Sequence, residues 1–262
     1  MNGWIRTALL SGMLGYRALF AWNTPGLFVV SLVLAPILQL IFFLVLGSSL
    51  GYGNPSFFVV GNAMQASAAA GISGLVAVIA DERRFGTLSY ILGSPGSPIA
   101  VFIGRLIPGV VLGTFVSVLT GLVGLVFIGS VPSTGQLLFF VTAAVVSSLS
   151  CSALGLGLSA LGLIHRDIYQ VATAAYLAVL VFSGSNVARE DIPSAVRWIG
   201  ELVPTTHAID ATRTVLAGAS ARGAMASLLI ELSVGIAWGA IALLGMRVLA
   251  YRARVTASLE LY

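Results

Sequence analysis

Long apolar runs limit what this chain can fold into more than any other feature of its sequence. The hydrocarbon core of a bilayer is ~30 Å thick, so a helix needs about 20 mostly apolar residues to cross it. Six runs meet this length, at about 27–50, 57–80, 106–128, 136–163, 168–188 and 224–250. Charged residues make up only 8% of the 262 residues, against about 25% in soluble domains. The sequence therefore predicts an all-α membrane protein, a single transmembrane domain over residues 1–262 with six spanning helices.

The segment before the first run has a different composition. Residues 3–22 carry Arg6 and Arg17 among aromatic and leucine side chains such as Trp4 and Trp22. Aromatic rings favour the membrane boundary and Arg favours the head groups, so we expect a helix that lies in the membrane interface. A disordered leader is the alternative.

The basic residues exclude two classes of protein. All 13 are Arg, and the sequence contains no Lys. A P-loop nucleotide site needs the Lys of its G-x-x-x-x-G-K-[ST] motif, so this sequence cannot hydrolyse ATP through such a site. The Arg residues do not cluster on a polar face, so no nucleic acid is expected as a partner. Cys151 is the one cysteine and lies in an apolar run, where it is expected to be a small buried side chain.

The Arg residues also indicate orientation, because cytoplasmic loops carry an excess of Arg and Lys. With the N-terminus in the cytoplasm, nine Arg lie on cytoplasmic segments and four on external ones. Both termini are therefore predicted to be cytoplasmic. In this topology His165 and His207 lie on opposite sides of the membrane, so they cannot share a metal ion, and no metal site is predicted.

Two connections are longer than a turn, and the first is the cytoplasmic segment 81–105. It opens with four charged residues, 81–84, and continues into a possible short helix over 87–92. Leu88, Ile91 and Leu92 would share one side of that helix, which Gly93, Pro95 and Pro98 would end. The residues alone leave two readings open: a docking helix for a cytoplasmic partner, or an ordinary positively charged loop.

The second long connection, 184–223, is too polar to span the membrane and too apolar for a free loop. We expect two short helices that dip into the outer leaflet, over 193–202 and 205–217, with Pro193 and Pro204 as boundaries. Asp210 and Arg213 would pair at i, i+3 on the second helix. A surface cap is the alternative.

Four of the polar residues inside the apolar runs are candidates for function. Glu231 is the one acid among them, and such a residue is a functional hypothesis by default. It could also lie at the outer interface and pair with Arg222 or Arg213. Gln39, Asn62 and Gln65 are the other three, with Asn62 and Gln65 on one helical face. They are candidates for a substrate path, or for hydrogen bonds between helices of one subunit.

Two motifs in order carry a resemblance to a known family. The first comprises Glu82, Gly86-Thr87-Leu88, Leu92 and Ser94-Pro95, and it resembles the E-x-x-x-G-T-L-x-x-x-L-x-[ST]-P signature of ABC-2 type permeases. The external segment is similar to that family's outer region at Ser183-Gly184, Pro193, Trp198, Pro204, Asp210, Arg213 and Gly218. These permeases are the membrane subunits of ATP-binding-cassette exporters.

The resemblance implies roles for the two connections and for the spans. The first connection would be a coupling helix that docks on an ATPase subunit through Glu82, Arg83, Arg84, Gly86, Thr87, Leu88 and Leu92, with Leu88 and Leu92 inserted as apolar side chains. The second would be a re-entrant hairpin that closes the outer exit, with gate residues Gly184, Pro193, Trp198, Pro204, Asp210 and Arg213. The possible substrate path would include Gln39, Asn62, Gln65 and Glu231.

The resemblance also implies the partners. Two ATPase subunits would bind ATP and Mg, and this chain would bind no cofactor of its own. A second permease, identical or paralogous, would complete the transporter in the cell membrane of a prokaryote. The cargo would be an amphiphilic or hydrophobic drug, a lipid or a polysaccharide precursor, moved outward. The competing hypotheses are a secondary transporter driven by an ion gradient, which would need a midplane ion site, and a non-transporting membrane scaffold.

Overall fold

The computed structural model describes residues 3–22, 30–51, 53–93, 98–161 and 168–255. The described residues form helices joined by turns, with no strand among them. The α-helices are α1 (Gly3–Trp22), α3 (Ala35–Ser49), α4 (Ser56–Ala68), α5 (Gly74–Arg84), α6 (Leu88–Gly93), α7 (Pro98–Gly104), α8 (Leu106–Phe127), α9 (Thr134–Leu161), α10 (Ile168–Phe182), α11 (Ser194–Leu202), α12 (Thr206–Leu216) and α13 (Ala221–Val255). Two π-helical turns, η1 (Val30–Leu34) and η2 (Ala69–Ser73), and a 3-10 turn, η3 (Arg189–Asp191), complete the set.

Five of the six predicted spans are long and apolar enough to cross a membrane. They are Leu32–Ser49, Ser56–Arg83, Ile99–Phe127, Thr134–Leu161 and Ala221–Val248. The sixth, expected over 168–188, is shorter: α10 has 15 residues and ends at Phe182. At 1.5 Å per residue it measures about 22 Å, less than the ~30 Å apolar core. Gly184, with φ +79°, turns the chain away where the prediction extended the helix.

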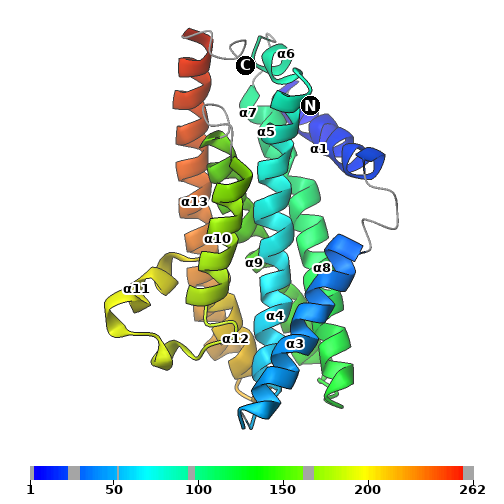
Figure 1. Cartoon of the computed structure of the whole chain (residues 1–262), viewed down its shortest axis with the longest axis vertical. Coiled ribbons are helices and arrows are strands. Elements are labelled where there is room, and N and C mark those ends of the chain that lie inside the picture. The colour runs from blue at the N-terminus through cyan, green and yellow to red at the C-terminus, as the bar shows by residue number, and fades with distance from the viewer. Residues whose placement is uncertain (1–2, 23–29, 52, 94–97, 162–167, 256–262) are drawn as a thin grey trace.

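The bundle has two ends that can be told apart in Figure 1. At the upper end α6 lies near α1 and the C-terminal part of α13, and at the lower end α12 lies beside the start of α4. These are called the α6 end and the α12 end below. The two long connections therefore lie at opposite ends, and both terminal helices reach the α6 end, as the Arg distribution predicts.

Small residues allow the helices to approach closely around α9. The side chains of Ser147, Ser148, Ser150, Cys151 and Ser152 on α9 are all fully buried. Hydroxyl groups among them are bonded to neighbouring helices: Ser147 to the Ser67 hydroxyl at 2.8 Å, and Ser150 to the Glu231 carbonyl at 3.0 Å. Small and hydroxyl side chains at helix contacts are typical of membrane bundles, where apolar burial alone does not favour association.

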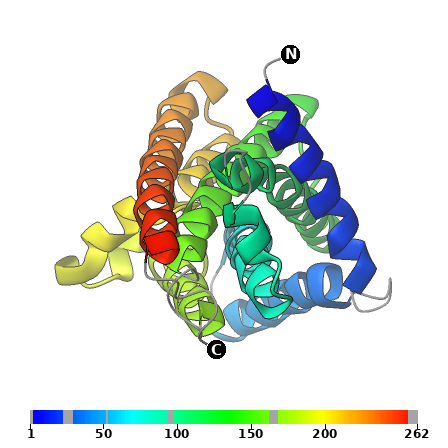
Figure 2. The same ribbon diagram turned by 90° about the horizontal axis from the view of Figure 1, so that it is seen from above.

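The segment 3–22 forms the expected helix, α1, which crosses the side of the bundle obliquely (Figure 2). It packs on α7, where the Ser11 hydroxyl donates to the Val101 carbonyl at 2.7 Å. A Cβ atom at Gly104 would clash with the Ala8 carbonyl, so glycine is needed there. The other face of α1 exposes apolar side chains, including Leu9, Met13 and Leu14. Pro98, expected to end a helix, instead begins α7, a position that tolerates the missing N–H.

Candidate functional site

At the α6 end, an ion pair and a hydrogen bond of Glu82 stabilise the turn between α5 and α6. The Glu82 carboxylate pairs with Arg105 and accepts a hydrogen bond from the Thr87 hydroxyl. Gly86 has φ +71°, a conformation that favours glycine, and the turn leads directly into α6. Glu82 thus stabilises the connection from within, whereas the resemblance places it in contact with a partner.

Leu88 is buried inside this chain. Its side chain is only 2% exposed and packs in an apolar cluster with Leu75, Phe102, Leu156 and Met246. The expectation that Leu88 inserts into another subunit therefore differs from the structure, because the side chain already has an apolar environment. The side chains of Arg84 and Leu92 lie outside the described residues. The outward surface of this segment carries Tyr90, which is 80% exposed, with Phe85, Thr87 and Ser89.

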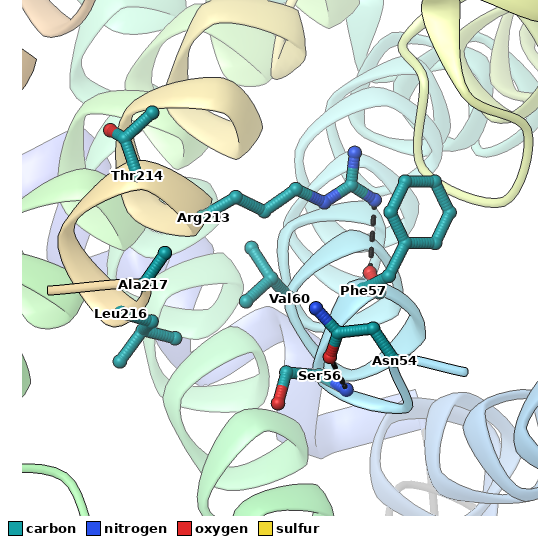
Figure 3. A pocket seen from close by; sticks show the side chains of 8 residues that line it. All are labelled: Asn54, Ser56, Phe57, Val60, Arg213, Thr214, Leu216 and Ala217. Atoms are coloured by element: carbon teal, nitrogen blue, oxygen red, sulfur yellow. Dashed lines mark hydrogen bonds between the residues drawn. The ribbon is translucent and has the colours of Figure 1, made fainter. Parts of the chain in front are cut away.

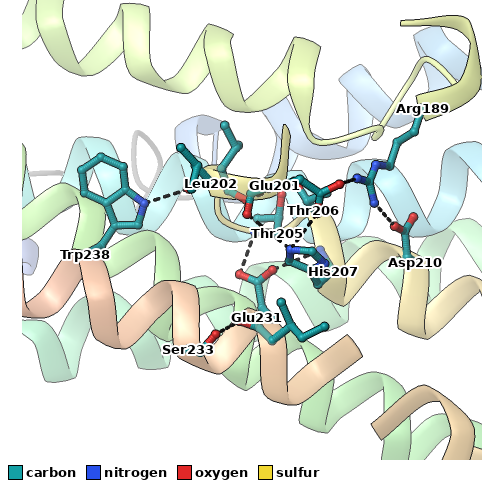
Figure 4. Close-up of polar contacts among 12 residues, drawn as sticks. Arg189, Glu201, Leu202, Thr205, Thr206, His207, Asp210, Glu231, Ser233 and Trp238 are labelled. Carbon is teal, nitrogen blue, oxygen red and sulfur yellow. Dashed lines mark hydrogen bonds and ion pairs between the residues drawn. The ribbon is translucent and has the colours of Figure 1, made fainter. Parts of the chain in front are cut away.

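At the α12 end, the predicted helical hairpin is present within one residue of its expected bounds, as α11 and α12. Its ion pairs differ from the prediction. Asp210 does not pair with Arg213 but with Arg189, whose Nη1 lies 2.7 Å from the Asp210 carboxylate, and Arg189 also pairs with Glu201 (Figure 4). Partial burial disfavours the Arg189 charge, but Asp210 and Glu201 outweigh it and raise the pKa of Arg189.

Arg213 instead donates hydrogen bonds to three backbone carbonyls. Its guanidinium donates to Gly184 at 2.9 Å, to Phe57 at 2.9 Å and to Ser185 at 3.1 Å. The guanidinium carbon also lies 3.6 Å from the centroid of the Phe57 ring, a cation–π contact. Burial lowers the pKa of Arg213 to about 10, although Asp210 opposes the shift, so the side chain is charged at neutral pH.

Glu231 on α13 holds the start of α12. Its carboxylate accepts the backbone N–H of Thr205 at 2.8 Å and of His207 at 3.2 Å, and its side chain is fully buried (Figure 4). The predicted pairing of Glu231 with Arg222 or Arg213 is wrong. N–H groups at the start of a helix take the place of the cation, because they too attract a carboxylate. Thr205 has φ +80°, unusual for a residue other than glycine, at the turn that follows Pro204.

The helix α11 extends outward from the bundle (Figures 1 and 2). Trp198 on this helix is 61% exposed, and Pro193 precedes the helix as its cap residue. The end of α11 is attached to α13, because the Trp238 indole donates to the Leu202 carbonyl at 2.9 Å. The residues predicted to form the gate all belong to the connection at the α12 end: Gly184, Pro193, Trp198, Pro204, Asp210 and Arg213.

The three amide residues expected on a substrate path do meet. Gln39 donates to Asn62 at 3.2 Å, and Asn62 donates to Asn186 at 2.8 Å. The Tyr176 hydroxyl donates to Gln39 at 3.0 Å, and Gln65 donates to the Tyr176 carbonyl at 3.4 Å. This amide cluster joins α3, α4, α10 and the turn after α10.

Sequence reasoning missed Tyr176 and Asn186, because nothing in their local pattern shows which helix they face. Glu231 is bonded elsewhere, and no hydrogen bond among the described residues joins it to the amide cluster. The expected path residues therefore form two separate sites. No group of three or more His, Cys, Asp or Glu in the described part of the chain is placed to hold a metal ion, and His165 lies outside that part.

Comparison with known proteins gives the family of the chain. Residues 11–217 match the family described as "ABC-2 type transporter". The chain is 26% identical over 137 residues to a protein of Escherichia coli (strain K12) named "Probable multidrug ABC transporter permease YbhR". It is 27% identical over 173 residues to the "Inner membrane transport permease YhhJ" of the same strain and of Shigella flexneri.

These alignments cover 52% and 63% of this chain but only 37% and 45% of the two relatives, so the chain spans less than half of their length. The family match, in contrast, takes in α6, the amide cluster and the hairpin, and it covers most of the sequence. This multi-pass membrane protein belongs to the ABC-2 type transporter family.

Proposed function

We propose that this chain is the permease subunit of an ATP-driven exporter, with a separate ATPase docked at the α6 end. Two ATPase subunits, carrying ATP and Mg, would serve two permeases, either two copies of this chain or this chain and a paralogue. The observation that carries the proposal is an exposed surface on α6 whose other side is anchored in the bundle core through Leu88. A short helix in a loop could not transmit force without such an anchor.

The proposed docking surface comprises Phe85, Thr87, Ser89 and Tyr90. An exposed aromatic side chain supplies much contact area at low entropy cost, which makes Tyr90 the expected centre of the contact. Arg83 and Arg84 would add charge-assisted contacts at its edge. Glu82 would act indirectly, because its bonds to Arg105 and Thr87 fix the turn that presents α6.

A path for the motion runs through α13. The apolar cluster under α6 includes Ala242 and Met246 of α13, and Glu231 of the same helix holds the first turn of α12. Glu231 and Met246 are separated by about 22 Å along one helix at 1.5 Å per residue. A displacement of α6 would thus be passed by a rigid element to the hairpin proposed to close the outer exit.

The proposed cargo is an amphiphilic or hydrophobic molecule such as a drug, a lipid or a polysaccharide precursor, exported from the inner membrane. The name of one relative includes multidrug transport and that of another places it in the inner membrane. The amide cluster of Gln39, Asn62, Gln65 and Tyr176, whose groups bond to one another across α3, α4 and α10, is the proposed polar contact on the path of such a cargo.

Copurification tests the docking surface. Tagged chain extracted from membranes of its own host is expected to retain vanadate-sensitive ATPase activity. Tyr90→Ala should lower the retained ATPase about tenfold, as loss of a central aromatic contact does. Trp198→Ala, a matched exposed aromatic at the opposite end, should leave the retained ATPase unchanged. Absence of ATPase from the wild-type preparation, or equal retention by both variants, would contradict the proposal.

A further inference from the structure

A pocket at the α12 end is not used by any role described so far. It has a volume of about 340 Å³ and lies between the start of α4 and the end of α12 (Figure 3). Asn54, Ser56, Phe57 and Val60 line it from the α4 side. Arg213, Thr214, Leu216 and Ala217 line it from α12. Its volume lies at the small end of the range for ligand sites, about 300–1,000 Å³, and suits a compact group.

The Arg213 charge at this pocket has no ion-pair partner among the described residues, although Asp210 on the same helix acts on it from beyond ion-pair distance. None of the eight lining residues is acidic, and the ion pairs of the described residues do not include Arg213. Asp210, the nearest acid on the same helix, is paired with Arg189 instead. The Arg213 guanidinium is held by carbonyls and a ring, and its buried Nε–H has no partner in the described structure. A partly buried cation that has hydrogen bonds but no ion-pair partner would be stabilised further by a ligand of opposite charge.

The remaining lining groups suit an anion with an apolar continuation. Asn54 accepts the Ser56 N–H through its amide oxygen at 3.1 Å, and its amide nitrogen is turned toward Val60 (Figure 3). Ser56 also lines the pocket, and its hydroxyl can donate. Val60, Leu216 and Ala217 give the pocket apolar walls. Donors of this kind around a guanidinium are typical of sites for phosphate or carboxylate.

We propose that this pocket binds an oxyanion, a phosphate or carboxylate, carried as the head group of an amphiphile at the outer face of the membrane. Arg213 supplies the charge, Asn54 and Ser56 supply hydrogen bonds, and the apolar walls hold the first carbons of the attached chain. The site stands on the pocket itself and does not depend on ATP-driven transport. A free anion such as inorganic phosphate shares the same chemistry and is distinguished below.

Calorimetric titration of the purified full chain in neutral maltoside micelles tests the site without any ATPase. Dihexanoyl phosphatidylglycerol is expected to bind, and dihexanoylglycerol, which lacks the phosphate, is not. Asn54→Asp keeps the oxygen that caps Ser56 but places a negative charge in the pocket, and it should weaken binding about tenfold. Ala217→Leu should also weaken binding, because it fills the pocket without adding charge. Both variants leave the carbonyl contacts of Arg213 in place.

Ser133→Asp is the matched control for added charge. Ser133 lies in the short connection before α9, and its hydroxyl accepts the Gln136 N–H, a role that Asp also fills. This variant should bind dihexanoyl phosphatidylglycerol as the wild type does. Equal binding of inorganic phosphate, in competition with the lipid, would assign the site to free anions. The proposal is overturned if neither probe binds, or if Asn54→Asp and Ser133→Asp change the affinity equally. Neither result would bear on docking of an ATPase at α6.

Discussion

At the scale of single residues, the partners of the charged groups differ from those suggested by spacing. Glu231 is held by two N–H groups of a helix start, and Asp210 by an Arg 21 residues earlier in the chain. A buried carboxylate is tolerated when its oxygens accept hydrogen bonds from groups that have no other acceptor, and the first turn of α12 offers such groups. The interior acid therefore belongs to the attachment of the hairpin.

Replacement of Glu231 by Gln tests this attachment. The amide keeps the shape of the side chain but has one acceptor oxygen, so an NH₂ group would face either the Thr205 or the His207 N–H. We expect a loss of about 1–3 kcal/mol, the penalty for an unsatisfied buried group. A lower thermal unfolding midpoint and faster proteolysis within 184–205 are the measurements. Glu190→Gln, at an exposed position of the same region, should change neither. A shift no larger than that of Glu190→Gln would contradict the role of Glu231.

At the scale of elements, close approach of backbones decides where the hairpin begins. The turn after α10 lies so near α4 that a Cβ atom at Gly61 would clash with the Ser185 carbonyl oxygen. The same carbonyl accepts a hydrogen bond from Arg213, and the neighbouring Asn186 bonds to Asn62. One contact between α4 and this turn therefore accounts for three features. They are the early end of α10, the amide cluster and the hydrogen bonds of Arg213.

Two Gly→Ala substitutions within helices distinguish the effect of this close contact on stability from the effect of helix propensity. Gly61→Ala should push the turn away from α4 and lower stability by about 1–3 kcal/mol, as overpacking does. Gly74→Ala is the control, because no atom lies within 4 Å of a Cβ built there. It should be neutral or stabilise the helix by up to about 1 kcal/mol. Thermal unfolding in detergent measures both. Similar unfolding midpoints for the two variants would show that the turn can move without cost.

At the scale of the whole molecule, the two long connections lie at opposite ends of a bundle with most of its core around α9. The Arg distribution predicts that the α6 end faces the cytoplasm. The exposed faces of α3 and α13 carry apolar side chains such as Phe42, Val45, Ile236 and Leu244. Those faces suit contact with lipid or with a second permease.

Cysteine labelling tests the orientation. Cys151 is the single cysteine and fully buried, so it should not react with a membrane-impermeant maleimide. Trp198→Cys should be labelled on intact cells, and Tyr90→Cys only after the membrane is permeabilised, because both positions are exposed at opposite ends. The reverse pattern would mean that the Arg count predicts the wrong orientation. Labelling of Cys151 in the wild type would show that the core around α9 opens.

What the sequence by itself determined was the set of elements. Three local patterns predicted these elements: the apolar runs predicted the spans, the prolines around 193–204 the hairpin, and the Gly-Thr-Leu turn α6. Local patterns suffice because the spacing of apolar residues and the positions of glycine and proline act over a few residues. The tertiary structure decided the partners: Leu88 turned inward, Asp210 bound Arg189, Glu231 bound N–H groups, and Arg213 remained beside an open pocket. Those choices depend on which segments lie side by side, since a buried polar group takes whichever partner its neighbours supply.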